Sequence, residues 1–224
     1  SQIEAGGDVI IRKGCQGKGL GKIIAGKSIV GQFFESAVLT AGKDVQATYL
    51  LNCQLKANGK LLVEGRKGVI IGGKTCAKLG VSCNGIGNIA EIATVVSVGI
   101  DKEDMTAYQE LQKKIEQTQA ELQTCENGLN KLMANSVHDE KISMMIQRLT
   151  RAVYTLKSSR KELFSERDAQ MEQMTKQKEA RIQVSGRAYP GTLLFLNEDP
   201  FAIKEIYNNV EFVKHDNRID TLAH

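Results

Sequence analysis

The chain repeats itself without a gap between residues 25 and 56, and this repeat restricts the possible folds more than any other feature. Ala25 and Ala41 each open a copy with Ala-Gly-Lys. The matches continue at the offset that separates these two alanines: Phe33 with Tyr49, Phe34 with Leu50, Ala37 with Cys53, and Leu39 with Leu55. A unit of this kind cannot bury its apolar side alone, so successive units must stack on one another.

Further copies open at Ala5 and Ala57, and a looser one opens at Ile71 with Ile-Gly-Gly-Lys. The resulting units are unequal in length and span 5–24, 25–40, 41–56 and 57–70. Short apolar runs of β-strand length lie between Gly or Asn-Gly corners, where the chain needs positive φ. Because the unit lengths are far from a hexapeptide beat, we predict that residues 1–100 form a right-handed parallel β-helix and not the left-handed acyltransferase type.

The repeat alignment also predicts which side chains share a column. One equivalent position, counted from the opening of each unit, holds small apolar side chains that suit an inward-facing stack: Ala37, Cys53, Val69 and Cys83. Asn52 occupies the position of Ser36 in the preceding unit, which suggests a ladder of corner hydrogen bonds. The two cysteines are therefore interpreted as core residues and not as nucleophiles or metal ligands.

A long helical segment interrupts the repeats. Of the 21 glycines, 18 precede residue 101 and one lies between residues 101 and 181, a region without proline. We expect Asp101 to cap the first helix, with Glu103 and Asp104 placed favourably in its first turn. Apolar residues then follow at steps of three and four, as in a coiled coil: Tyr108, Leu111, Ile115, Thr118, Leu122, Cys125, Leu129 and Leu132.

Residues 134–139 break this pattern, and a second helix is predicted from about Asp139 to Arg181. Its seam is apolar at first (Ile142, Ile146, Leu149, Val153, Leu156 and Leu163) and polar later (Arg160, Arg167 and Gln170). Residues 101–135 carry 4 basic and 7 acidic groups, whereas residues 139–181 carry 10 and 7. These opposite balances favour an antiparallel coiled-coil hairpin over residues 101–181, either a contact surface for a partner or second copy, or a self-contained spacer.

Residues 182–224 return to a β pattern. An alternating run at 182–184, a turn at Tyr189-Pro190-Gly191 and an apolar run at 192–196 predict strands, and a short helix is expected after Pro200. We expect these strands to rejoin the β-helix where the chain left it at Gly99. They would cap an open end that otherwise exposes unpaired backbone groups.

Catalytic constellations are missing from the repeats. The histidines (His138, His215 and His224) all lie outside them, although a β-helix acyltransferase needs a base beside a cleft. A polysaccharide lyase or hydrolase would need clustered carboxylates, whereas the acidic residues of the first hundred are scattered: Glu4, Asp8, Glu35, Asp44, Glu64 and Glu91. Asp8 and Asp44 stand at equivalent corners, where turn hydrogen bonds explain them.

Two glycine-rich stretches resemble phosphate loops only superficially. Residues 14–22 lack the Gly-Lys-Ser/Thr ending of a Walker motif and no helix follows them, and residues 85–88 are interpreted in the same way. Five cysteines without a CxxC pair argue against a disulfide framework or zinc site and fit a reducing compartment. No signal peptide or long apolar run is present, so we expect a soluble, cytoplasmic chain that could be a fragment of a longer protein.

The pattern as a whole resembles the flagellar assembly protein A family. The resemblance rests on residues 3–11, residues 35–45, the approach to the hairpin at 98–101, and Tyr189-Pro190-Gly191. It spans nearly the whole chain. The repeats are also similar to the C-terminal domain of the division inhibitor MinC and, more distantly, to bactofilins. The resemblance implies a bacterial cytoplasmic protein with a right-handed β-helix that acts in flagellar assembly or polar localisation, and it implies no catalytic residues.

The sequence thus predicts a mainly β protein in three parts: the β-helix (1–100), the hairpin (101–181) and the rejoining strands (182–224). Its predicted function is a non-enzymatic scaffold that binds a protein partner or a second copy. No catalytic, cofactor-binding or metal-binding residue and no small-molecule substrate is predicted. The first hundred residues carry 12 basic and 6 acidic groups, so the alternative is a nucleic-acid-binding module that uses the basic coils and second helix. An enzyme built on the β-helix is a third possibility.

Overall fold

The computed structural model describes residues 2–65, 67–134, 139–216 and 218–223. These residues form two compact units. One comprises residues 1–101 together with 174–224, and the other comprises residues 102–173. The first unit is a stack of β coils, and the second is a pair of long helices inserted between two of these coils.

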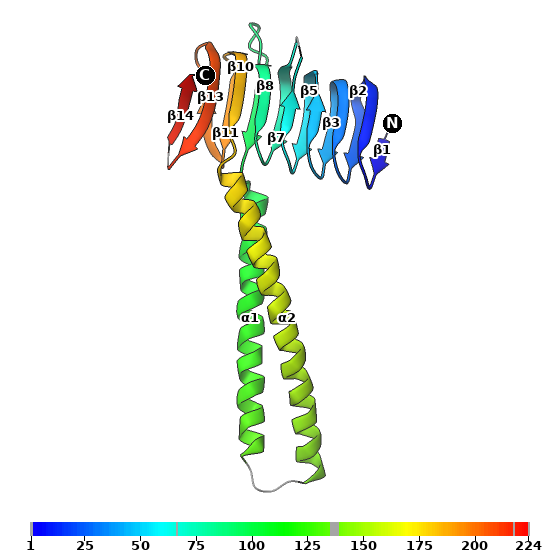
Figure 1. The fold of residues 1–224 in the computed structure, drawn as a ribbon, viewed down its shortest axis with the longest axis vertical. Coiled ribbons are helices and arrows are strands. Elements are labelled where there is room, and N and C mark those ends of the chain that lie inside the picture. Colours follow the sequence, from blue (N-terminus) through cyan, green and yellow to red (C-terminus); the bar gives the residue numbers. More distant parts are fainter. Residues whose placement is uncertain (1, 66, 135–138, 217, 224) are drawn as a thin grey trace. The chain divides into compact units, whose positions relative to one another are not determined.

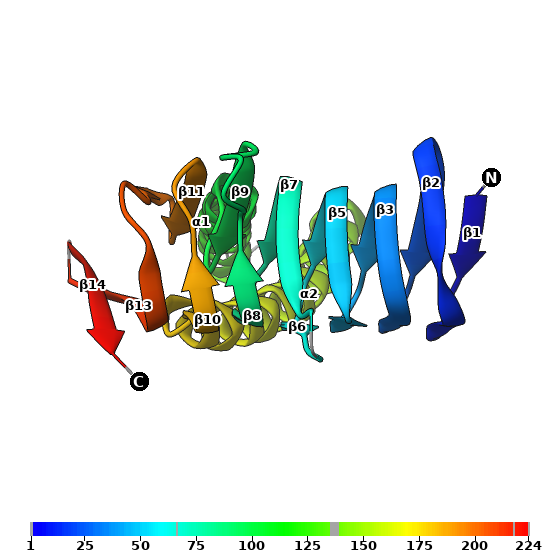
Figure 2. The ribbon, with the colours of Figure 1, turned by 90° about the horizontal axis from the view of Figure 1, so that it is seen from above.

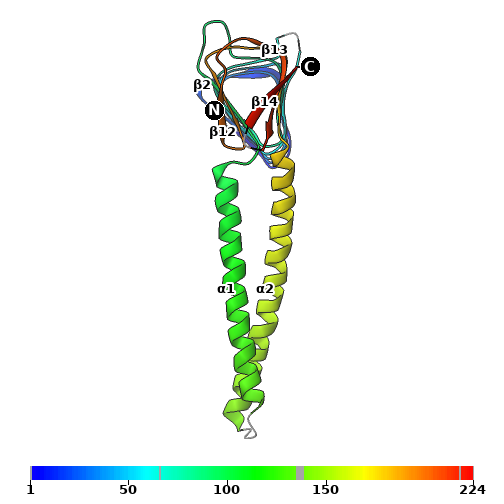
Figure 3. The ribbon, with the colours of Figure 1, turned by 90° about the vertical axis from the view of Figure 1, so that its left-hand side faces the viewer.

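The first unit is a parallel β-solenoid, which confirms the predicted fold class. Before the insertion its strands are β1 (Gln2–Ala5), β2 (Val9–Ala25), β3 (Ile29–Ala41), β4 (Val45–Ala47), β5 (Tyr49–Ala57), β6 (Leu61–Val63), β7 (Val69–Ala77), β8 (Val81–Ile86) and β9 (Thr94–Val98). After it come β10 (Ile182–Ala188), β11 (Thr192–Leu196), β12 (Asp199–Ala202), β13 (Tyr207–His215) and β14 (Arg218–Ala223). Viewed along the stack, the coils superimpose as a roughly triangular outline (Figure 3).

Each coil has three sides, defined here by the first complete coil: side 1 at residues 9–11, side 2 at 14–16 and side 3 at 21–25. Side 1 continues through the start of β3 to β4, β6, β8 and β10. Side 3 continues through β5, β7, β9 and β11. Figure 2 shows these neighbouring strands in sequence order along the stack.

The alanines that open the repeats lie directly above one another, as predicted. Ala5 pairs with Ala25, Ala25 with Ala41, and Ala41 with Ala57. A sheet tolerates this column because the side chains are small and point into the core, where Ala25, Ala41 and Ala57 are all buried. The predicted pairs Phe33 with Tyr49 and Leu39 with Leu55 also hold.

The looser opening at Ile71 is wrong. Ala57 pairs with Ala77, so the coil that opens at Ala57 continues to residue 76 and does not end at residue 70. Gly72 and Gly73 belong to a different corner, between sides 2 and 3, where both adopt positive φ (69° and 76°). They are the structural equivalents of Asn52 and Cys53 in the preceding coil. Their Gly-Gly sequence resembles the motif that opens the repeats, although that motif belongs to another corner.

The predicted inward column is correct for Ala37 and Cys53 and wrong for the other two members. Gly73 stands above Cys53, Val69 pairs with Tyr49 on side 2, and Cys83 pairs with Val63 on side 1. Cys83 still faces the core, where it is 4% exposed. Ser36 and Asn52 share the left-handed conformation at their corner (φ 47° and 51°), and the hydrogen-bond ladder suggested there stays a prediction.

The C-terminal strands rejoin the coils, as predicted. β10 pairs with β8 and β11 with β9, both in parallel, so they form another coil. The chain then reverses: β12 runs antiparallel to β11, β13 to β10, and β14 to β13. The short helix expected after Pro200 is wrong, because Pro200 lies within β12 opposite Phe195. β12 stands at the end of the sheet order, an edge where a residue without an N–H is tolerated.

The second unit is an antiparallel helix pair. α1 spans Lys102–Met133 and α2 spans Glu140–Lys178. Asp139 caps α2 by accepting a hydrogen bond from the Ile142 amide (2.8 Å). Two contacts show that the helices run antiparallel. Glu126 forms a salt bridge with Lys157 (2.8 Å), and further along α1 a Cβ on Gly128 would lie 3.7 Å from Cδ1 of Leu149, earlier in α2. α2 ends earlier than predicted, because the Arg181 carbonyl already accepts a hydrogen bond from Val81 of the coils.

Burial along the helices follows the predicted seam. Leu111, Ile115, Leu122 and Val153 are buried, and the other apolar seam residues are half-buried. Arg160, Arg167 and Gln170 are half-buried, in keeping with a more polar seam later in α2. Within the predicted break, residues 135–138 lie outside the described residues.

Substituting Gly73 tests the stacking corner. In Gly73→Ala the new Cβ would overlap the Cys53 carbonyl oxygen, and the residue would have to keep its positive φ of 76°. We expect the free energy of unfolding to fall by roughly 1–3 kcal/mol from backbone strain alone, with a further loss from the overlap. Chemical denaturation measures it. The matched control is Gly7→Ala, whose Cβ meets nothing within 4 Å; equal stability of the two variants would contradict the assigned corner.

Candidate functional site

The acidic side chains of the coils do not converge on a catalytic centre. Asp8 accepts a hydrogen bond from the Ser28 amide (2.8 Å), and Asp44 accepts one from the Lys60 amide (2.7 Å). Each carboxylate thus links one corner to the corner of the next coil. The corner role predicted for Asp8 and Asp44 is confirmed, but the hydrogen bonds are made between coils and not within a turn. Glu35 accepts a hydrogen bond from the Gln16 side chain (2.8 Å), and Glu64 and Glu91 are exposed at separate corners.

Histidine and metal chemistry receive no support from the described geometry. His215 is exposed near the end of β13, opposite Arg218 of β14, whereas His138 and His224 lie outside the described residues. Across residues 2–65, 67–134, 139–216 and 218–223, no group of three or more His, Cys, Asp and Glu side chains is arranged to hold a metal ion.

The five cysteines are free thiols in contrasting environments. Cys53 and Cys83 are buried, at 1% and 4% exposure, whereas Cys15, Cys76 and Cys125 are half-buried. Burial raises the pKa of the Cys83 thiol, because the surrounding core disfavours the thiolate. Burial likewise raises the pKa of Cys53, whose Sγ donates to the Phe34 carbonyl (3.2 Å). Neither thiol is suited to nucleophilic chemistry, which requires a thiolate at neutral pH.

These thiols predict both a reactivity pattern and an alkaline loss of stability. A thiol-specific chromogenic reagent should modify Cys15, Cys76 and Cys125 in the folded chain, and Cys53 and Cys83 after unfolding. As the pH rises above 9.0, the ordinary value, the unfolded chain loses thiol protons that the folded chain retains, so the free energy of unfolding falls. In a Cys53→Ala, Cys83→Ala variant this alkaline decline should shrink. Equal reactivity of all five folded thiols would contradict the assignment.

One groove of the solenoid unit is open and polar. It has a volume of about 580 Å³ and is lined by Lys60, Lys176, Glu179, Arg181 and Gln183, among other residues. Close to it lies the buried carboxylate of Glu211, 5% exposed, which Arg181 Nη1 (3.1 Å) and the Gln183 amide (3.2 Å) both contact. Because this buried charge already has partners, the groove offers a satisfied ion pair and not a reactive acid.

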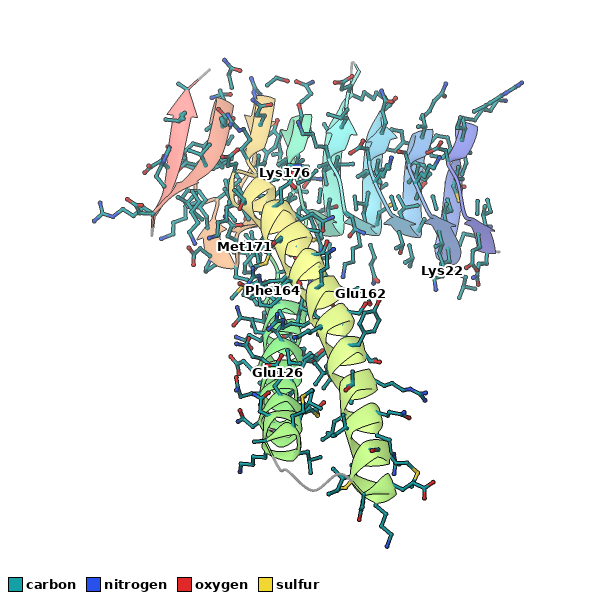
Figure 4. The ribbon with its side chains drawn as sticks, turned by 60° about the horizontal axis from the view of Figure 1, so that its bottom comes forward. Lys22, Glu126, Glu162, Phe164, Met171 and Lys176 are labelled. Carbon is teal, nitrogen blue, oxygen red and sulfur yellow. The ribbon has the colours of Figure 1, made fainter. Side chains whose placement is uncertain are left out.

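Lysines recur on the outside of the coils. Lys22 and Lys74 lie in one outward row on side 3, joined through Val38 and Gln54. Lys27 and Lys43 lie in adjacent coils, where the Lys43 amide donates to the Lys27 carbonyl (3.0 Å). Figure 4 shows Lys22 at the outer surface of β2. We call Lys22, Lys27, Lys43, Lys60 and Lys74 the lysine rows; they form a surface able to attract an anionic partner.

Side 2 has an apolar outer surface, which the sequence analysis missed. The inward residues of this side are fully buried (Phe34, Leu50 and Ile70). Five of their six outward neighbours are apolar and half-buried, and we call these five the apolar patch: Phe33, Tyr49, Leu51, Val69 and Ile71. The sixth is Glu35, which pairs with Leu51 in the same outward row. The signal was available in the sequence, because the runs Tyr49-Leu50-Leu51 and Val69-Ile70-Ile71 are apolar on both faces of a strand and do not alternate.

The helix pair exposes a second apolar feature, also missed. At the end of the pair, where α1 finishes and α2 begins, the exposed fractions of Met133, Met144 and Met145 are 61%, 55% and 55%. We call these three residues the methionine tip. Methionine is flexible and polarizable, and such side chains recur on protein surfaces that bind partners. Paired methionines next to a predicted helix break were the signal in the sequence.

The family comparison gives one match over almost the entire length. The family described as Flagellar Assembly Protein A beta solenoid domain matches residues 1–219. The chain belongs to this family. The resemblance inferred from the repeat openings and the returning strands is thereby confirmed, and it connects the chain with flagellar assembly. No curated protein and no solved structure matched the chain.

Membership of the flagellar assembly protein A family agrees with the architecture, since the matched region includes the coils, the inserted helices and nearly all of the returning strands. Neither α1 nor α2 contains a stretch apolar enough to cross a lipid bilayer.

Proposed function

We propose that this chain is a non-enzymatic, cytoplasmic scaffold in flagellar assembly or polar localisation, and that it holds a protein partner through the helix pair. The family match supports the link to flagellar assembly. The observation that carries the proposal is the helix pair itself, because two long helices that pack mainly on each other end in an exposed cluster of apolar side chains.

The helix pair is far longer than core filling requires. α1 has 32 residues and α2 has 39, so they extend for about 48 Å and 59 Å. Few of their side chains are buried: Leu111, Ile115, Leu122 and Val153 in the seam, and Gln177 near the end of α2. Most of the remaining surface is polar. A helix pair of this length places the methionine tip far from the residues at which the pair begins, which suits a role in bridging to a partner.

The methionine tip is suited to contact with a protein. Its three side chains come from both helices. Charged residues lie close to them in the sequence, including Lys131, Glu140 and Lys141. Apolar side chains with more than half of their surface exposed gain free energy when a partner covers them. Because methionine adapts its shape, this surface fits an apolar groove or helix face on a partner.

The proposal of a non-enzymatic role is supported by where the reactive groups lie. Asp8 and Asp44 bind corner amides, Glu211 is engaged by Arg181, and Cys53 and Cys83 are buried. Each of these groups has a structural task, and none faces another reactive side chain across a groove.

The methionine tip can be tested by capture of partners from the host lysate. Each buried methionine contributes roughly 1.5–3 kcal/mol, so the triple variant Met133→Gln, Met144→Gln, Met145→Gln should reduce capture of the partner more than tenfold. Quantitative mass spectrometry of the captured proteins measures this, with nuclease present to remove bridging nucleic acid. Excising residues 102–173 behind a short Gly-Ser linker should abolish capture while the coils stay folded.

The matched control is the double variant Met105→Gln, Met171→Gln. These methionines are 43% and 55% exposed and lie on the same helices away from the methionine tip. The control should capture the partner like the unmodified chain, and circular dichroism should show equal helix content in both variants. If the tip variant and the unmodified chain retain the same proteins in equal amounts, the proposal fails.

A second candidate function, binding of nucleic acid, is favoured by the lysine rows. Repetition of the coils places cationic side chains at neighbouring levels on the same side of the stack, as Lys27 and Lys43 show. Such an array matches a chain of phosphates through charge and without base recognition.

Salt dependence distinguishes this candidate from the scaffold. If the lysine rows bind duplex DNA, fluorescence anisotropy should detect binding at low salt that weakens steeply as salt is added. Lys27→Gln with Lys43→Gln should remove about two phosphate contacts and reduce the slope of log K against log salt by about 1.8. The control is Lys204→Gln, an exposed lysine between β12 and β13. Absence of binding at low salt would eliminate this candidate.

A further inference from the structure

The first half of α2 carries a run of positive charge without an acidic residue. Residues 141–161 contain six basic side chains: Lys141, Arg148, Arg151, Lys157, Arg160 and Lys161. In contrast, residues 162–178 contain three basic and four acidic side chains, and α1 contains four and six. The excess of positive charge is therefore confined to the part of α2 that starts at the methionine tip.

Helical spacing places four of these cations on the outer face of α2. The seam residues between 142 and 153 turn toward α1, so the side chains between them turn outward. Two apolar side chains lie on the outer face: Met144, four residues before Arg148, and Tyr154, three residues after Arg151 and 79% exposed. The four cations are all exposed, and we call them the basic face: Lys141, Arg148, Arg151 and Lys161.

The charge of the basic face is not neutralised by the described part of the chain. Of the other cations in the run, Lys157 forms a salt bridge with Glu126, and Arg160 is half-buried. No carboxylate among the described residues pairs with a member of the basic face. Like charges three or four residues apart, such as Arg148 and Arg151, destabilise a helix. An anionic partner would remove this repulsion.

The combination of charge and exposed apolar surface matches an acidic protein segment. Arginine guanidinium groups bind carboxylates in bidentate pairs. Met144 and Tyr154 flank the two arginines, and they gain free energy when apolar side chains cover them. A helix with carboxylates between apolar residues, at spacings of three and four, provides both contacts and packs along the length of α2.

Duplex DNA and anionic lipid fit this surface less well. The phosphates of a duplex would meet the cations but would leave Tyr154 and the methionine tip against a charged backbone. A helix that lies in a lipid surface needs a broad apolar face. The apolar stripe of α2, which includes Ile142, Ile146 and Leu149, packs against α1, and the outer face is mainly charged and polar.

We propose that the basic face binds an acidic amphipathic helix of the partner protein, and that the basic face and the methionine tip form one contact surface. From Lys141 to Lys161 this surface is about 30 Å long, at a rise of about 1.5 Å per residue. The inference rests on the proposed function, because it gives the chemistry of the partner that the helix pair holds.

Selection from a peptide library tests the charge of the partner. Phage would display helices as long as the basic face, with one side varied among glutamate, lysine, glutamine and leucine, and the immobilised full chain would be the target. The selected peptides should be enriched in glutamate and leucine and depleted of lysine. Selection on the variant Arg148→Glu, Arg151→Glu should instead enrich lysine. A preference for lysine on the unmodified chain, or no charge preference at all, would overturn the inference.

Fluorescence anisotropy of one selected peptide measures the contribution of the arginines. The variant Arg148→Gln, Arg151→Gln should bind it roughly tenfold more weakly, because two charge pairs are lost. The matched control Lys113→Gln, Lys114→Gln removes the same charge from exposed positions of α1 and should bind like the unmodified chain. Circular dichroism should show equal helix content in both variants. Equal affinity of the two variants would contradict the assigned face.

Competition distinguishes the protein partner from other anions. Neither duplex DNA nor phosphatidylglycerol vesicles in excess should displace the selected peptide. Displacement by either would assign the basic face to nucleic acid or to lipid.

The excised chain without residues 102–173 separates this inference from the proposed function. If excision abolishes capture of the partner but the arginine variant keeps full affinity, the basic face is wrong and the proposed function stands. If the excised chain still captures the partner, the proposed function itself fails.

Discussion

Hydrogen bonding between successive coils is the constraint on which the rest of the solenoid depends. Each coil satisfies its backbone groups on the next one, so the corners must close at the same place in every turn. The alanine column from Ala5 to Ala77 and the corner carboxylates Asp8 and Asp44 fix that closure. Once the closure is fixed, every outward side chain acquires a neighbour one strand spacing away, and rows such as the lysine rows and the apolar patch result.

The repeat predicted this core well because inward positions obey steric rules that are visible in one dimension. Ala25, Ala41 and Ala57 recur where space is smallest, and Leu39 and Leu55 recur where it is larger. The prediction failed where one residue type serves two corners. Gly72 and Gly73 satisfy a left-handed turn after side 2, yet they read like an opening glycine, and the longer corner around Gly65 hid the true length of that coil.

The outer surfaces were harder to predict, because stacking does not dictate them. Tyr49 and Leu51 suit a strand whether or not a partner covers them, and their meaning appears only when Phe33, Val69 and Ile71 are placed beside them. The methionine tip poses the same problem. Met133 belongs to α1 and Met144 to α2, and the sequence pattern of either helix alone does not show that they lie at the same end of the pair. No catalytic site was predicted for a different reason, namely that no stretch of the repeats matched a catalytic motif.

The insertion of the helix pair between β9 and β10 has a consequence for the order in which the molecule assembles. β10 completes its hydrogen bonds on β8, and β11 on β9, so the last coil must wait for segments far apart in the sequence to meet. A helical hairpin folds from local contacts and reverses the direction of the chain. It therefore lowers the entropic cost of bringing β10 to β8. The helix pair that interrupts the solenoid in the sequence therefore also favours the pairing of its last parallel coil.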